Sequence, residues 1–289
     1  TLFRSWKNGE NDKLGWRLEY NMKHRGDVYA THGLGPVAQA LDIHRGDRMK
    51  TLVAMDTKSV VGKSLVEERT GQPCENFRNG DHTTTLIRTE NGKVIEIQHD
   101  VMTPQPYNRL YQLTGTKGVA NKYPIEGYAL DAKQLNASGV APEVDNLNSH
   151  SFMPKKDMEA LVQKYQHPIL KKYGEMAKEV GGHGGMDFIM DSRLVYCLQN
   201  GLPLDMDVYD LAEWCCLAEL GELSMDNNCA AVAFPDFTRG EWNKVKGYKH
   251  AYASPEDESV AMEKAKKITA KLKEKGAVEW AGEAVENKK

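Results

Sequence analysis

Apolar and polar residues alternate most regularly between residues 83 and 101, and this pattern predicts a β-hairpin. Two alternating segments are separated there by Asn91-Gly92. That dipeptide favours a type I′ turn, whose twist matches that of two paired strands. Strand-like segments follow at residues 110–114 and 117–123. Spacings this short predict an antiparallel meander, because parallel strands need long crossovers.

A helical period of apolar residues dominates the second half of the chain. The predicted helices span residues 155–165, 169–180, 187–199, 208–220 and 255–275. The helix at 187–199 has few polar positions, so it is expected to be buried. Asp207 is expected to cap the helix that follows it, which should end at Gly221.

The order of these elements predicts an α+β fold with an open, mainly antiparallel sheet and helices packed on one face. The sheet is expected mainly from residues 50–123, including a strand within 51–61. Residues 1–25, 62–80 and 124–155 look irregular or loop-like.

Candidate chemistry concentrates in Gly26–Pro36, which reads G-D-V-Y-A-T-H-G-L-G-P. Pro36 is expected to be the first residue of a helix, because proline is suited to that position. The inner face of that helix should contain Val37, Ala40 and Leu41. Tyr29, Thr31 and His32 would then lie in the loop before a helix N-terminus, where free N–H groups attract an anion or oxyanion. The alternative is an ordinary turn that contains a histidine.

Two further segments admit either a functional or a structural interpretation. The glycine-rich run 181–187 contains His183 and Asp187, and it can approach a ligand closely or simply connect two helices. Tyr107 and Arg109 follow the hairpin on a proline-rich corner, where they suit a sugar or an anion. Packing of Tyr107 into the core is the alternative.

The pattern of potential ligand residues does not predict a metal site. His44, His82 and His99 lack ligand-like spacing, and His99 is expected to be an ordinary paired or exposed histidine on a strand. The acidic run 205–210 resembles a calcium loop only loosely, and helix capping explains Asp207 better. The five cysteines form no C-x-x-C pair.

Composition excludes several classes of protein. The chain has 289 residues, 27% of them charged, and a formal net charge of −3, which gives no reason to expect a nucleic-acid partner. No apolar run approaches the length of a membrane span. The first residues resemble neither a signal peptide nor an initiator methionine, so we expect a fragment or processed product. Its compartment, cytoplasmic or exported, stays open.

Several long motifs, in order along nearly the whole chain, resemble one family. It is glycoside hydrolase family 109, the NAD-dependent α-N-acetylgalactosaminidases within the Gfo/Idh/MocA superfamily, and the resemblance is to the C-terminal domain. The motifs are G-D-V-Y-A-T-H-G-L-G-P, I-H-R-G-D (43–47), P-Y-N-R (106–109), G-T-K-G (115–118), G-G-H-G-G-M-D-F-I-M-D (181–191) and N-G-L-P-L-D-M-D-V-Y-D-L-A-E-W (200–214).

The resemblance implies a two-domain enzyme in which residues 1–289 form the substrate-binding and catalytic C-terminal domain. The N-terminal Rossmann domain that holds NAD has no counterpart in this chain, so the chain alone is expected to be inactive. The implied reaction removes terminal α-linked N-acetylgalactosamine from a glycan. It proceeds by oxidation of C3 by NAD⁺, elimination of the C1 substituent, addition of water and return of hydride, without the usual carboxylate pair.

Matching the motifs residue by residue implies a set of site residues. His32 and Tyr29 correspond to catalytic positions, and Arg17, Tyr29 and Tyr107 to substrate-binding positions. The cofactor-binding positions implied are Tyr29, Ala30, Thr31 and His32. Ala30 stands where the motif leads us to expect proline, so the loop should be somewhat looser.

Two other functions stay open. One is an NAD(P)-dependent oxidoreductase acting on a sugar or cyclitol, because dehydrogenases are common in the superfamily. The other is a non-catalytic module that binds sugar or mediates oligomerisation. In either case the exposed face of the sheet is a natural surface for a homo-oligomer.

Overall fold

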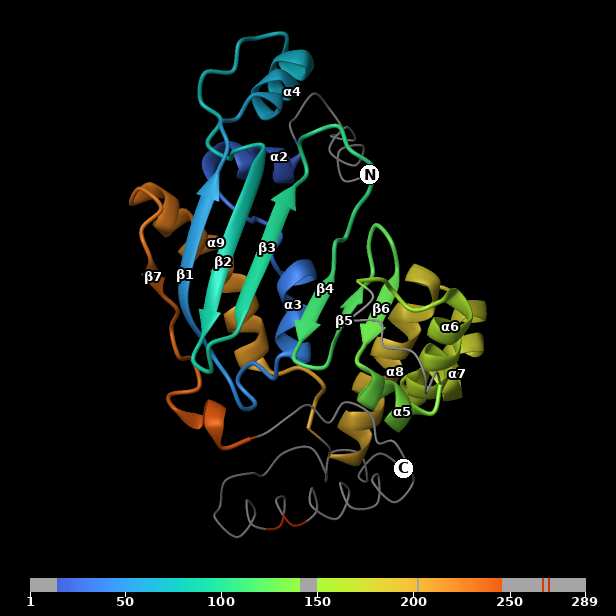
Figure 1. The fold of residues 1–289 in the computed structure, drawn as a ribbon. Coiled ribbons are helices and arrows are strands. Elements are labelled where there is room, and N and C mark those ends of the chain that lie inside the picture. Colours follow the sequence, from blue (N-terminus) through green and yellow to red (C-terminus); the bar gives the residue numbers. More distant parts are fainter. Residues whose placement is uncertain (1–14, 141–149, 202, 246–266, 268–269, 271–289) are drawn as a thin grey trace, which may run out of the picture. The chain divides into compact units, whose positions relative to one another are not determined.

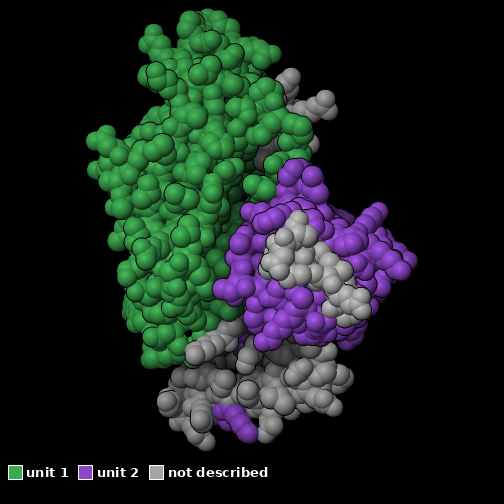
Figure 2. Space-filling model, viewed as in Figure 1, with its two compact units in different colours: residues 1–110, 206–248 green, residues 111–205, 249–289 purple. Residues whose placement is uncertain are grey.

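The computed structural model describes residues 15–140, 150–201 and 203–245, together with residues 267 and 270. The chain divides into two compact units, coloured separately in Figure 2. Unit 1 comprises residues 1–110 and 206–248, and unit 2 comprises residues 111–205 and 249–289. Each unit therefore combines segments that are distant in sequence.

Unit 1 is built on a four-stranded antiparallel sheet, whose strand order is β3-β2-β1-β7 (Figure 1). Helices α3 and α9 cover one face of this sheet, and α2 and α4 lie near one end of it (Figure 1). The elements are α2 (Trp16–Lys23), α3 (Thr31–Ala40), β1 (Met49–Asp56), α4 (Val61–Thr70), β2 (His82–Thr89), β3 (Val94–Asp100), α9 (Val208–Asp226), β7 (Val232–Ala233) and the 3₁₀ turn η2 (Glu241–Asn243).

Strand alternation places the core of unit 1 between that sheet face and the two helices. Leu52, Ile87 and Ile97 point inward and meet Leu34 of α3 and Leu217 of α9. Their neighbours in sequence point to the opposite face, where Met55, Leu86 and Val94 are exposed. The sheet is therefore open on one side, as the sequence predicts.

Unit 2 contains a separate three-stranded antiparallel sheet and four α-helices within its described residues. Its small core contains the buried side chains of Leu135 and Met153. The elements are β4 (Gln112–Gly115), β5 (Gly118–Asn121), β6 (Gly127–Leu130), α5 (Ala132–Ser138), α6 (Lys155–Tyr165), α7 (Pro168–Val180), the 3₁₀ turn η1 (His183–Gly185) and α8 (Met186–Asn200).

The fold class and the hairpin are confirmed, and the turn type is wrong. The strands β2 and β3 pair from His82–Asp100 to Arg88–Val94. Of the Asn91-Gly92 pair only Gly92 has a positive φ, of 82°, whereas a type I′ turn needs two such residues. The Thr89 N–H donates to the Lys93 carbonyl at 2.9 Å, so the connection is a longer loop with glycine in its left-handed position.

The single sheet expected from residues 50–123 is wrong, because β4 and β5 belong to the second sheet. The loop expected at 124–155 is also partly ordered, since it contains β6 and α5. Asp131 caps α5 by accepting the N–H of Gln134, which explains why a helix forms there.

The strand expected through residue 61 ends at Asp56, and α4 begins at Val61, in a region predicted to be irregular. The carboxylate of Asp81 accepts the N–H groups of Val60, Val61 and Gly62 at 2.8–3.0 Å. This cap comes from a residue about twenty positions further along the chain, so local pattern does not reveal it.

Pro36 does not begin a helix, because α3 starts five residues earlier at Thr31. The Ala30 carbonyl accepts the N–H groups of Gly33 and Leu34, which starts the helix before the proline. Its buried residues are Leu34, Gly35 and Ala38, while Val37 and Leu41 are partly buried and Ala40 is exposed. His32 consequently lies in the first turn of the helix and not in the preceding loop.

The later helices begin close to the predicted residues, but α9 is longer than predicted and α8 is more exposed. The predicted helices that correspond to α6 and α7 are confirmed, and Asp207 caps α9 through a reciprocal pair of contacts with Asp210. Helix α9 continues past Gly221 to Asp226. Helix α8 is not buried, since Leu198 is 62% exposed. The helix predicted at 255–275 lies almost entirely outside the described residues.

Candidate functional site

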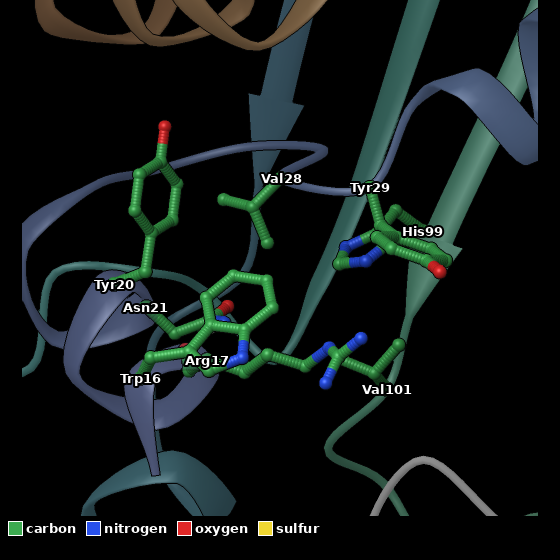
Figure 3. A pocket seen from close by; sticks show the side chains of 8 residues that line it. All are labelled: Trp16, Arg17, Tyr20, Asn21, Val28, Tyr29, His99 and Val101. Carbon is green, nitrogen blue, oxygen red and sulfur yellow. The ribbon is translucent and has the colours of Figure 1, made fainter.

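A small open pocket lies in unit 1, between α2, the loop that precedes α3, and the end of β3 (Figure 3). Its cavity volume is about 20 Å³. Its walls are mostly apolar and aromatic, with a few polar groups, as is typical of ligand pockets. The lining residues are Trp16, Arg17, Tyr20, Asn21, Val28, Tyr29, His99 and Val101.

Asn79 holds two walls of this pocket together. Its side-chain N–H donates to the Asn21 side chain of α2 at 2.5 Å, and its carbonyl oxygen accepts the Gly26 N–H at 2.8 Å. Asn21 in turn donates to the Arg17 carbonyl within α2. Helix α2, in a segment expected to be irregular, is therefore fixed to the loop that carries Tyr29.

The structure brings Arg17, Tyr29 and His32 together. The rings of Tyr29 and His32 stack with centroids 4.5 Å apart, and the Arg17 guanidinium lies 5.9 Å from the centre of the Tyr29 ring. Although His32 is exposed, partial desolvation of its ring, and then the positive charge of Arg109, lower its pKa. A neutral imidazole results near pH 7, which can accept a proton.

Tyr107 has no direct contact with these three residues among the interactions described. It is 57% exposed, so it does not pack into the core, and the Arg109 guanidinium lies 5.7 Å from its ring. Since the charge of Arg109 also acts on His32, this arginine connects the two parts of the predicted site.

The remaining predicted positions, Ala30 and Thr31, form the start of α3. Ala30 is only 5% exposed and belongs to the core, so its side chain is not available to a ligand. Thr31 Oγ1 lies 3.5 Å from Nδ1 of His32. The first N–H groups of a helix lack partners within the helix, so this segment can offer donors to a carbonyl or an oxyanion.

His99, expected to be an ordinary paired or exposed histidine on a strand, lines the pocket. It is neither exposed nor paired at hydrogen-bond distance; its Nε2 lies 3.9 Å from Oδ1 of Asp27. Burial lowers the pKa of His99 and raises that of Asp27. The alternation along β3 could have indicated this position, because His99 is two residues from Ile97 and four from Ile95, and both of these face inward.

Two buried nitrogen atoms among the lining residues have no hydrogen-bond partner, namely Nε of Arg17 and Nε2 of His99. Buried polar groups in folded proteins are normally paired, so such atoms need an explanation. Because both residues line the same pocket, a polar ligand could satisfy them.

A second polar cluster in unit 1 surrounds the buried His44. Its Nδ1 lies 2.9 Å from Glu213, and its Nε2 lies 3.4 Å from Asp207. Burial lowers the pKa of His44, but the hydrogen bond to Glu213 and the nearby carboxylate of Asp207 raise it to about 9. His44, Asp207 and Asp210 could each offer one ligand atom to a metal ion. Arg45 already pairs with Asp210 through two bonds of 3.0 and 2.9 Å, so the carboxylates of this cluster belong to a network of ion pairs.

In unit 2, His183 and Asp187 form an exposed pair at 2.8 Å. Asp187 lies in the first turn of α8, and the residues around the pair connect α7 to α8. This agrees with the structural interpretation of the glycine-rich run. In the part of the chain that the structure describes, we find no helix both long and apolar enough to cross a membrane.

Comparison with known proteins identifies the family. The model of the glycosyl hydrolase 109 C-terminal domain matches residues 4–244, and this range includes every lining residue of the pocket. The chain belongs to glycosyl hydrolase family 109. The resemblance seen in the motifs is therefore confirmed.

Curated relatives share this family name. The chain is 84% identical over 284 residues to glycosyl hydrolase family 109 protein 5 of Phocaeicola vulgatus, covering 98% of the chain and 55% of the relative. It is 63% identical over 238 residues to a family 109 protein of Porphyromonas gingivalis, covering 82% of the chain and 51% of the relative. The chain thus spans about half the length of the curated relatives it matches.

Proposed function

We propose that this chain is the substrate-binding part of a glycosidase that removes terminal α-linked N-acetylgalactosamine by an NAD-dependent route. Family membership supports the glycosidase class. The observation that supports a sugar site most directly is the pocket in which the buried Arg17 Nε and His99 Nε2 lack partners. Sugars carry hydroxyl and acetamido groups, and one such group entering this small pocket could pair with Arg17 and with the imidazole of His99, while aromatic walls suit the apolar faces of a sugar ring.

NAD would supply reversible oxidation of a sugar carbon when bound. The residues of this chain that fit the reactive end of that cofactor are Thr31 and His32, because they begin α3 and offer N–H groups and a hydroxyl. A whole dinucleotide is much larger than this pocket. We therefore propose that the rest of the cofactor is held by the half of the relatives that this chain does not cover.

The chain's own residues have distinct roles in this proposal. Arg17 donates hydrogen bonds to the sugar, and Tyr29 holds the sugar and stacks on His32 to fix the orientation of the imidazole. His32 is neutral near pH 7 and exposed, so it can take a proton from the substrate and return it later. Tyr107 contacts the part of the substrate that extends beyond the pocket.

The open face of the four-stranded sheet carries exposed Met55, Leu86 and Val94. We propose that a second copy of the chain packs on this face, since exposed apolar patches often mark interfaces. A concentration-dependent sedimentation coefficient that Leu86→Lys abolishes would support this. A monomer at all concentrations would contradict it.

The test of the function joins this chain to the N-terminal half of the Phocaeicola vulgatus relative and measures nitrophenol release from 4-nitrophenyl α-N-acetylgalactosaminide. We expect the joined protein to turn over without net NADH formation, and this chain alone to be inactive. His32→Ala should reduce kcat by roughly 100-fold or more, since positioned proton transfer contributes that much. His183→Ala, a change in unit 2, is the matched control and should keep full activity.

Two outcomes would replace the proposal. Accumulation of NADH with free sugars, without glycoside cleavage, would indicate a sugar or cyclitol oxidoreductase. Sugar binding with no turnover of either kind would indicate a binding module.

A further inference from the structure

His99 combines three properties that a structural histidine does not need. It lines the pocket beside Tyr29 and Arg17, and in Figure 3 the edge of its ring that carries the two nitrogens points into the pocket. Its Nε2 is buried without a hydrogen-bond partner. Its nearest carboxylate, that of Asp27, lies 3.9 Å away, too far for a hydrogen bond.

We propose that His99 is a second proton-accepting residue of the pocket, which binds a sugar hydroxyl and takes up its proton, while Asp27 stabilises the charged imidazole. This inference rests on the proposed sugar site. It assigns a role to a residue that the family motifs quoted above do not include.

The position of Asp27 determines which tautomer of the neutral His99 imidazole is favoured. Because its carboxylate faces Nε2, it favours the neutral tautomer with the proton on that nitrogen, and Nδ1 is left to accept. When the hydroxyl proton moves to Nδ1, the ring becomes positive and the attraction to Asp27 strengthens. No group other than the hydroxyl and the imidazole gains or loses a proton in this transfer.

Asp27 is held for this task by its own surroundings. It is only 4% exposed, and its Oδ1 accepts the N–H of Tyr29 at 3.0 Å. The same carboxylate oxygen therefore fixes the backbone of Tyr29 and faces His99. This couples the two pocket residues through one buried carboxyl group.

The charges around His99 agree with a neutral ring that can be protonated. Burial lowers its pKa, the carboxylates of Asp27 and Asp100 raise it, and the neighbouring His82 lowers it. The cationic Arg17 also lines the pocket. A ligand that covers the pocket and removes water would strengthen the influence of burial and of each of these charges on the pKa of His99.

The first experiment records ring ¹⁵N shifts of His99 in this chain by NMR, between pH 5 and 8, with and without N-acetylgalactosamine, N-acetylglucosamine or galactose. We expect the Nε2-protonated tautomer at pH 7 and a change in the His99 signals when a sugar binds. His82, on the adjacent strand but not in the pocket, is the internal control. If none of the three sugars changes the His99 signals, the inference is overturned whatever the joined protein does.

The second experiment uses the joined protein. His99→Gln should lower kcat for the nitrophenyl substrate by about 100-fold with little change in KM, whereas the matched control His82→Gln should remain active. Asp27→Asn keeps an oxygen for the Tyr29 N–H but removes the charge, so the acidic limb of the kcat profile should move to lower pH. An unchanged kcat in His99→Gln, or an unmoved limb in Asp27→Asn, would refute a proton-accepting role.

The two experiments separate the proposals. If the joined protein does not cleave the substrate but sugar binding changes the His99 signals, the reaction assigned above fails and the sugar-hydroxyl contact stands. If cleavage proceeds and His99 is unaffected by sugar, the proposed function stands and this inference fails.

Discussion

Two buried imidazoles of unit 1, His44 and His99, both face carboxylates but have opposite protonation behaviour. His44 has Glu213 at 2.9 Å and Asp207 at 3.4 Å, and its pKa is raised to about 9. His99 has Asp27 at 3.9 Å, and burial lowers its pKa. Both rings are largely removed from water, so burial alone does not explain the difference.

The comparison teaches that the number and the distance of the carboxylates decide which effect dominates, since three carboxylates lie 2.9–3.7 Å from His44 whereas Asp27 lies 3.9 Å from His99. At hydrogen-bond distance a carboxylate compensates for the lost hydration of the imidazolium, and beyond it desolvation wins. His44 is consequently a cation at neutral pH that joins the segment after α3 to α9. His99 stays neutral and can respond to whatever enters the pocket.

The largest effect is expected from His44→Leu, which leaves the carboxylate of Glu213 buried without its partner. Glu213 is 3% exposed, so unfolding free energy should fall by about 3–5 kcal/mol. Urea denaturation would measure it. Combining His44→Leu with Glu213→Leu should recover most of the loss, because an apolar pair often replaces a buried ion pair at little cost. A loss below about 1 kcal/mol would show that His44 is not a buried cation.

The second-largest effect is the pH dependence of the free energy of unfolding, to which the two histidines should contribute with opposite signs. The raised pKa of His44 gives stability that is fully present below about pH 6.5 and is lost as pH rises through about 9, amounting to about 3 kcal/mol. The lowered pKa of His99 costs stability as pH falls below about 6.5, since the unfolded chain then binds the proton more readily.

Unfolding midpoints in urea between pH 5 and 10 would show both effects. The alkaline loss should be absent in His44→Leu, and the acidic loss should be reduced in His99→Gln. If the urea midpoints of the wild type and both variants changed with pH in the same way, the predicted difference between His44 and His99 would be contradicted.

The smallest effect should come from Ala30→Pro, which stiffens the loop next to His99 and not the network around His44. Ala30 has φ of −60°, close to the value that proline fixes. The change should raise unfolding free energy by about 0.4–1 kcal/mol, mainly by restricting the unfolded chain. Thermal unfolding would measure this, with Gln39→Pro in the last turn of α3 as a destabilising control. A loss of stability would mean that the core cannot accept the proline ring.

Local pattern was enough for elements whose stabilising contacts lie within or next to them. The hairpin alternates over both strands, and Asp207 lies beside the helix it caps, so both were predicted correctly. Helix α4 could not be predicted in this way, because its cap is the distant Asp81. Helix α2 was missed since its buried side includes a polar residue, Asn21, whose partner is Asn79.

In the candidate site, too, contacts between residues close in sequence were predictable and contacts between distant residues were not. Tyr29 and His32 are close in sequence, and the motif alone places them together. The approach of His99 to Asp27 depends on how β3 meets the loop before α3, which no local spacing reveals. Pro36 was placed wrongly for a similar reason: Gly35 packs against Trp214 of α9, and this distant contact favours helix on both sides of the proline.

The division of the chain has a consequence for its biosynthesis. Strands β1 to β3 leave the ribosome before α9, and residues 111–205 are made in between. At roughly 5–20 residues per second, the inward face of the sheet waits on the order of 6–20 seconds for its helical cover. During that interval the apolar side chains of Leu52, Ile87 and Ile97 lack α9, while β4 to β6 and α5 to α8 are being synthesised. The nascent sheet is therefore the stage at which chaperone binding would be most needed.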